Sequence, residues 1–131
     1  MLLGMIRYQQ LEAWGTAHRL VLEVYRLTES WPQREWYGLV AQTRRAAASV
    51  PLNIAEGSAK RGPLEFRRFL DISLGSLAEL HYALRLALDL GYLTPDDWAS
   101  VMALRDETSK VTWGLYRVVS ARCTIQRPRA P

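Results

Sequence analysis

The sequence predicts an all-α protein, an antiparallel up-down-up-down bundle of four helices whose second helix is kinked. Three observations predict this fold class. Apolar residues recur at the spacing of a helix face in four stretches. No stretch alternates polar and apolar residues between turn residues, as a strand does. The links between the four stretches are two or three residues long, which makes consecutive helices antiparallel neighbours.

The first helix is predicted over about 11–30. It carries two apolar faces, one that includes Leu20 and a second that includes Trp14. Trp31 precedes a proline, and the residue before a proline avoids the helical region. The helix therefore ends before this pair.

The second helix is predicted over about 34–60, with Pro51 inside its apolar pattern. A proline in a helix removes one backbone donor and crowds the carbonyl of the residue four positions before it, here Ala47. We expect a kink at this point rather than a break. The run Ala46–Ser49 has little side-chain bulk, so a neighbouring helix can approach it closely.

The third helix is predicted over about 63–90, because Pro63 suits a first helical position and Gly91 suits the residue after a helix end. The fourth is predicted over about 95–122. Thr94 is a typical N-cap, and the two aspartates that follow the proline complement the positive end of the helix dipole.

The composition predicts one globular domain over 1–123, followed by a basic flexible tail over 124–131. Apolar residues make up 49 % of the 131 residues and charged residues 23 %, which excludes a disordered chain. The single cysteine excludes a disulfide framework within the chain. No apolar run approaches the ~18 residues of a membrane span, and no signal peptide is recognisable. We therefore expect a cytoplasmic protein with no membrane contact.

The chain is basic, with a net charge of +4 and a pI near 9.6. Its 17 basic residues are 15 arginines and 2 lysines. Arginine presents a planar fork of donors that suits phosphate. A GC-rich genome also gives a high ratio of arginine to lysine, because its codons favour arginine. The sequence leaves both explanations open.

The antiparallel order gathers positive charge at the end of the bundle that holds the link between the second and third helices. Arg67 and Arg68 lie in the first turns of the third helix, where the helix dipole disfavours cations. A phosphate partner, met non-specifically as structured RNA or duplex DNA, explains such a placement. A solvated basic end, or ion pairs with a neighbouring subunit, explains it too. The candidate nucleic-acid-binding residues are Arg44, Arg45, Lys60, Arg61, Arg67, Arg68, Arg122, Arg127 and Arg129, with Arg7 at the same end. The sequence shows no strip of aromatic residues of the kind that binds single strands.

Two polar stripes are predicted to face each other inside the bundle. Such stripes form either a buried network that fixes the register between helices or, less commonly, a ligand site. Gly57 and Gly75 are expected to mark close contacts between helices. The stripes consist of Ser49, Asn53 and Glu56 on the second helix and of Ser73, Ser76 and Glu79 on the third.

No residue pattern predicts catalysis, a metal or a cofactor. His18 and His81 lack acidic residues at the Glu-x-x-His spacing of bundle metal sites. Cys123 has no histidine beside it. A phosphate-binding glycine loop and a nucleophile elbow are both absent from the sequence. We expect a protein that is not an enzyme.

Aromatic residues predict a homo-oligomer. Five tryptophans and six tyrosines are too many for the interior of four thin helices. A second apolar face on a bundle helix indicates a partner surface, and interface cores favour such side chains. The predicted interface residues are Trp14, Trp36, Tyr37, Trp113 and Tyr116.

The motifs Glu35-Trp-Tyr-Gly-Leu39, Ser49-Val-Pro-Leu-Asn-Ile-Ala-Glu-Gly57 and Leu74-Gly-Ser-Leu-Ala-Glu-Leu80 carry a resemblance. The chain resembles, over about 8–122, the four-helix-bundle proteins encoded in intervening sequences of bacterial 23S ribosomal RNA genes. The accessory protein of diversity-generating retroelements is related to that family. The resemblance implies a cyclic homo-oligomer, typically a pentamer. It also implies association with nucleic acid and with a reverse transcriptase, because the retroelement accessory protein associates with both. It implies no catalytic residue.

The sequence therefore supports two functional hypotheses. The first is an oligomeric nucleic-acid-binding or ribonucleoprotein accessory factor that acts through its basic end. The alternative is an oligomeric scaffold that binds a protein partner and makes no contact with nucleic acid.

Overall fold

The computed structural model describes residues 8–126, with side chains described up to Cys123. This part of the chain contains four long helices and no strand. Short helical turns precede the first two long helices. The elements are η1 (Tyr8–Gln10), α1 (Glu12–Thr28), η2 (Gln33–Glu35), η3 (Trp36–Val40), α2 (Ala41–Ser58), α3 (Pro63–Asp89) and α4 (Pro95–Gln126).

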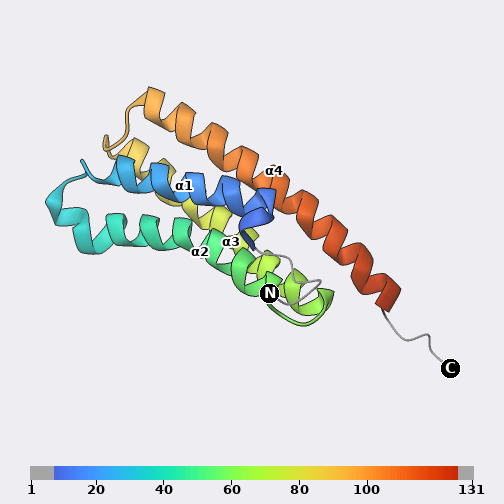
Figure 1. Ribbon diagram of the computed structural model, residues 1–131. Coiled ribbons are helices and arrows are strands. Elements are labelled where there is room, and N and C mark those ends of the chain that lie inside the picture. The colour runs from blue at the N-terminus through green and yellow to red at the C-terminus, as the bar shows by residue number, and fades with distance from the viewer. Residues whose placement is uncertain (1–7, 127–131) are drawn as a thin grey trace.

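The four long helices lie side by side around one apolar core (Figure 1). Each contacts two others: α1 packs against α2 and α4, and α3 packs against the same two helices. Every link places consecutive helices in contact, which is the neighbour pattern expected of a bundle with short connections. No helix within residues 8–126 is long and apolar enough to cross a membrane.

Valines at the two ends of α4 show which face of this helix is buried. Val101 and Val119 are buried, whereas Val118 is 53 % exposed. Eighteen residues make five turns of an α-helix, so Val119 returns to the face of Val101 and Val118 does not. The helix also continues to Gln126, into the predicted tail, because no helix-breaking residue occurs before Pro128.

The predicted second helix is divided near its start. Its first residues form η2 and the wide turn η3, and α2 begins only at Ala41. Gly38 has a φ of −105° and a ψ of −107°, which lie outside the helical region. This non-helical residue separates η3 from a regular helix. Glu35 anchors the segment, because the Tyr92 hydroxyl donates a 2.8 Å hydrogen bond to its carboxylate. From Ala41 the helix continues without a break through Pro51.

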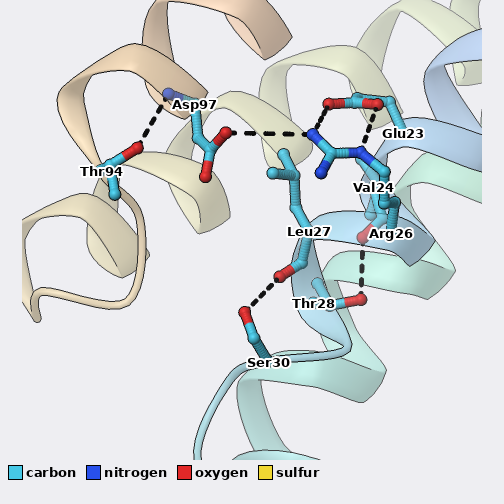
Figure 2. Close-up of polar contacts among 8 residues, drawn as sticks. All are labelled: Glu23, Val24, Arg26, Leu27, Thr28, Ser30, Thr94 and Asp97. Atoms are coloured by element: carbon cyan, nitrogen blue, oxygen red, sulfur yellow. Dashed lines mark hydrogen bonds and ion pairs between the residues drawn. The ribbon is translucent and has the colours of Figure 1, made fainter.

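Polar contacts tie α1 to the start of α4 (Figure 2), at the end of the bundle that lies opposite the α2–α3 link (Figure 1). Arg26 donates from Nε to Glu23 at 3.1 Å, and its Nη2 lies 3.9 Å from Asp97. The Thr94 hydroxyl accepts a 3.1 Å hydrogen bond from the backbone N–H of Asp97, which confirms the predicted N-cap. The hydrogen bond from Arg26 lowers the pKa of Glu23 below its ordinary value, and the positive charge of Arg26 adds to the effect.

We expect this contact to make stability depend on pH in the acid range. A carboxyl whose pKa is lower in the folded state stabilises the fold above its unfolded pKa of about 4.3. That contribution disappears as the pH falls through the folded pKa. The melting temperature should therefore fall less from pH 5 to pH 3 for Arg26→Met than for the unchanged protein. Arg85→Met, which breaks the exposed ion pair with Asp89, is the matched control. Equal losses in the protein and in Arg26→Met would contradict the assignment.

Candidate nucleic-acid interface

Basic side chains surround the turn between α2 and α3. Lys60 follows the end of α2, Arg61 lies in the turn, and Arg67 and Arg68 lie in the first turns of α3. Arg67 is half-buried and the other three are exposed. The ammonium of Lys60 lies 5.5 Å from the ring centre of Phe69, and the guanidinium of Arg68 lies 5.2 Å from the same centre. Two cations, one from the α2–α3 link and one from α3, thus converge on one aromatic ring.

This basic end is only partly neutralised. Arg68 pairs with Glu65 at 3.5 Å, and both side chains are largely exposed. Among the described residues, Lys60, Arg61 and Arg67 make no ion pair with an acidic side chain. An exposed pair contributes little binding between its partners, so Arg68 can exchange Glu65 for a stronger anion. The end therefore presents positive charge to solvent.

The C-terminal part of α4 extends toward the same end of the bundle as the α2–α3 link (Figure 1). Arg122 is exposed on this part of α4. The other arginines predicted for this end, Arg7, Arg127 and Arg129, lie outside the described residues.

The structure does not bring Arg44 to the basic end. Its side chain is only 15 % exposed and lies between α1 and α2. The guanidinium donates a 2.8 Å hydrogen bond to the Thr28 hydroxyl and lies 4.4 Å from the Tyr25 ring centre and 4.9 Å from that of Trp36. With a rise of 1.5 Å per residue, Arg44 lies about 24 Å along the helix axis from Lys60. Its contacts hold η3 and α2 against α1.

A shallow apolar furrow, here called the α2 furrow, runs along the outer side of α2. One end is a hollow of about 320 Å³ that Tyr25, Trp36, Tyr37, Arg44 and Arg45 help to line. Two adjoining hollows share Ala48 with it, and one of them also shares Arg45. They continue past Leu52 to Ala59. Tyr8 and Trp14 form the side wall of that second part. Ala41, Ala48 and Ala55, one every seven residues, keep the furrow open.

Aromatic residues that are far apart in the sequence line the α2 furrow. Tyr8, Trp14, Tyr25, Trp36 and Tyr37 all line it. Tyr37 is 93 % exposed. These residues come from η1, α1 and η3, and only the packing of α1 against α2 aligns them. The spacing within any single segment gave no signal of this grouping.

The predicted interface residues fall in two places. Trp14, Trp36 and Tyr37 lie in the α2 furrow. Trp113 and Tyr116 lie together on α4, with ring centres 5.3 Å apart and nearly perpendicular. Trp113 is 44 % exposed, so this pair forms a second aromatic surface.

Four of the six predicted network residues come together between α2 and α3. The Ser49 hydroxyl accepts hydrogen bonds from Ser76 at 2.7 Å and from the Asn53 amide at 2.9 Å. Ser73 donates to the carbonyl of Val50 at 2.9 Å. That carbonyl lies beside Pro51 and gains a donor from the next helix. The four side chains satisfy one another and the backbone, which favours the structural role over a ligand site.

Glu56 and Glu79 do not belong to this network. Both carboxylates are exposed, and neither hydrogen-bonds to the serines or to Asn53. Glu56 follows Ser49 by seven residues and lies on the same side of α2, where it lines an open hollow with Ser49 and Asn53, so its carboxylate reaches solvent rather than the serines of α3. A charged group left unpaired in the interior would cost several kcal/mol, on the order of the penalty for a buried ion.

The two histidines are exposed and contact tryptophan rings, and the cysteine is buried. His18 stacks on Trp14 with ring centres 4.9 Å apart, and His81 meets the edge of Trp98 at 5.7 Å. Cys123 is buried. Within the described part of the chain, no three His, Cys, Asp or Glu side chains lie close enough to hold a metal ion.

Comparison with known proteins gives a family and a fold. The model of the 23S rRNA-intervening sequence protein family matches residues 9–114. A crystal structure of a protein with unknown function from the S23 ribosomal protein family of Bacteroides thetaiotaomicron superposes with a TM-score of 0.75. The two chains share 18 % identity, and the match covers 86 % of this chain and 99 % of that one. No curated protein matches this chain.

Proposed function

This chain belongs to the 23S rRNA-intervening sequence protein family, and on that premise we propose that it is a non-enzymatic accessory protein that binds nucleic acid through its basic end. The observation that carries the proposal is the convergence of Lys60 and Arg68 on the Phe69 ring. Each cation lies within 5.5 Å of the same ring centre, so the two charges are at most about 11 Å apart and a single polyanion can contact both.

The binding is to the phosphate backbone. The fork of each guanidinium spans two oxygens of a phosphate, and each neutralised phosphate releases condensed counterions. Contacts of this kind carry no sequence information. The partner is therefore structured RNA or duplex DNA, bound for its shape and charge.

We further propose that the bundle has the antiparallel up-down-up-down order, with a kink at Pro51. The contacts of α1 with both α2 and α4 support this order. It gives Lys60, Arg61, Arg67, Arg68 and Arg122 one common end.

We also propose a cyclic homo-oligomer in the cytoplasm, a pentamer by family resemblance. The exposed Trp113–Tyr116 pair on α4 supports a contact between copies, because aromatic side chains are enriched in interface cores. A cyclic arrangement presents the same end of every copy on one side. The basic ends then add up to one positive field that attracts a polyanion.

Reversing two charges tests the function. Arg67→Glu/Arg68→Glu should lower affinity for a hairpin RNA more than 10-fold at ~100 mM salt, and the slope of log K against log salt should fall by about two. Glutamates in the first turns of α3 suit the helix dipole, so the fold should persist. The measurement is fluorescence anisotropy, with the mass of the particle taken from light scattering.

The matched control is Arg34→Glu/Arg85→Glu, which changes the net charge equally at the other end of the bundle. This control should keep most of the affinity. Equal losses in the two double variants would mean that net charge alone attracts the RNA. Dissociation of the oligomer in Arg67→Glu/Arg68→Glu would identify these arginines as interface residues and contradict the proposal.

A second candidate function is a scaffold that binds a protein partner, such as a reverse transcriptase, and no nucleic acid. The apolar lining of the α2 furrow favours it. This candidate predicts no binding of hairpin RNA or duplex DNA even at low salt.

A further inference from the structure

We propose that the Tyr37 end of the α2 furrow binds an unstacked base of single-stranded nucleic acid, with Arg45 on the neighbouring phosphate. This inference rests on the proposed function. It adds that a second surface, the Tyr37 end of the furrow, recognises the single-stranded form of the nucleic acid. The basic end holds backbone phosphates of any strand. The Tyr37 end accepts only a base that has left its stack.

Tyr37 presents its ring to solvent from a rigid support. The ring is 93 % exposed, next to Trp36 at 44 %. The wide turn at Gly38 projects these side chains, and such irregular helical turns are frequent at functional sites. The hydrogen bond from Tyr92 to Glu35 and the contact of Arg44 with Trp36 fix the turn on both sides. The backbone that carries the exposed ring is thus held in place.

Positive charge lies in the same hollow. The guanidinium of Arg44 is fixed over the faces of Tyr25 and Trp36, and only the exposed Glu29 pairs with it. Arg45 is exposed and makes no ion pair with any described residue. Aromatic faces for bases and cations for phosphates are the two parts of a single-strand binding surface.

The dimensions of the hollow suit a base rather than a duplex. About 320 Å³ lies at the lower end of the range for ligand pockets. A base inside a duplex is stacked on both sides and cannot reach Tyr37. From this hollow the furrow follows α2 to Ala59, about 30 Å at 1.5 Å per residue, and ends next to Lys60. One strand can therefore contact Tyr37 and the basic end together.

Charge favours this occupant over a second copy of the chain. Arg45 is exposed and Arg44 pairs only with the exposed Glu29, so the Tyr37 end of the furrow is positive. An anionic strand is attracted to it, whereas contacts between copies have a separate surface in the Trp113–Tyr116 pair on α4.

The test compares single and double strands on the full-length protein. Tyr37→Ala should lower the affinity for an oligonucleotide of about twelve nucleotides by about 5- to 150-fold, the range for losing one stacked base. Affinity for a duplex of the same length should stay within about twofold. Tyr37→Phe keeps the ring and should keep the single-strand affinity. Tyr82→Ala, which removes an exposed tyrosine of α3 far from the furrow, is the matched control.

A probe that lacks bases separates stacking from charge. A strand of abasic sites should bind the unchanged protein as weakly as the normal strand binds Tyr37→Ala. Binding of the abasic strand to Tyr37→Ala should be hardly weaker than either. Equal single-strand affinity for Tyr37→Ala and the unchanged protein, with duplex binding intact, would overturn this inference and leave the proposed function standing. If the unchanged protein bound neither the duplex nor the single strand, both this inference and the proposed function would be overturned. A smaller particle mass for Tyr37→Ala would assign the hollow to contacts between copies instead.

Discussion

Truncating Leu80 to alanine should lower the free energy of unfolding by about 2–5 kcal/mol, the range for deleting a fully buried leucine side chain. Leu80 is 0 % exposed and lies in the middle of α3, the helix that packs against both α2 and α4. The loss has two parts, the lost transfer of the side chain from water and the cavity left in the core. The free energy of unfolding of a small domain is about 5–15 kcal/mol in total, so this one change removes a large share of the stability. Urea denaturation followed by circular dichroism gives the difference.

Leu64→Ala is the matched control on the same helix. Leu64 is 54 % exposed, so its truncation should change the free energy of unfolding by less than about 1 kcal/mol. Similar losses for the two variants would mean that α3 does not bury the face that includes Leu80.

Replacing Gly57 by leucine should destabilise the bundle by about 1–3 kcal/mol or more, the cost of overpacking a closely packed site. A Cβ atom at Gly57 would lie 2.8 Å from the Cβ of Phe69 and 3.0 Å from Cδ1 of Phe66. Phe69 Cβ is attached directly to the backbone of α3 and cannot move aside alone. Gly57→Ala meets the same contact, and the roughly 1 kcal/mol that alanine gains over glycine in a helix offsets only part of it.

Gly75→Ala separates the clash from helix propensity. The sequence predicts a close helix contact at both glycines, but at Gly75 the structure leaves open space within 4 Å of the added Cβ. That prediction was wrong because Gly75 lies on the exposed side of α3. Gly75→Ala should raise the free energy of unfolding by up to about 1 kcal/mol. Thermal and urea unfolding of both variants measure the difference, and a stabilising Gly57→Ala would contradict the close approach.

Local signals in the sequence predict the four helices and most of their ends. Pro63 and Gly91 act at the ends of α3 as their backbone preferences require, and the N-cap of α4 uses Thr94. Gly38 carried no comparable signal, since one glycine within an apolar pattern is compatible with a continuous helix. The separation of η3 from α2 depends on contacts made by Arg44 and Glu35 with α1 and the α3–α4 link.

The candidate site is predictable only where it is local in sequence. The basic turn lies within nine residues from Lys60 to Arg68, so charge counting finds it. The α2 furrow joins Tyr8, Trp14 and Tyr37, which meet only after α1 packs against α2. Arg44 and Arg45 show a further limit, because adjacent arginines have different surroundings: one is enclosed between two rings and the other faces solvent.

The most direct test of nucleic-acid binding through the basic end is the salt dependence of hairpin RNA binding, followed by fluorescence anisotropy from about 50 to 200 mM salt. Lys60, Arg61, Arg67 and Arg68 predict a slope of log K against log salt of about −3 to −4 per chain in contact with the RNA. The affinity should then fall by about 100-fold across this range. No binding at 50 mM salt, or binding with a slope near zero, would contradict phosphate recognition by this end.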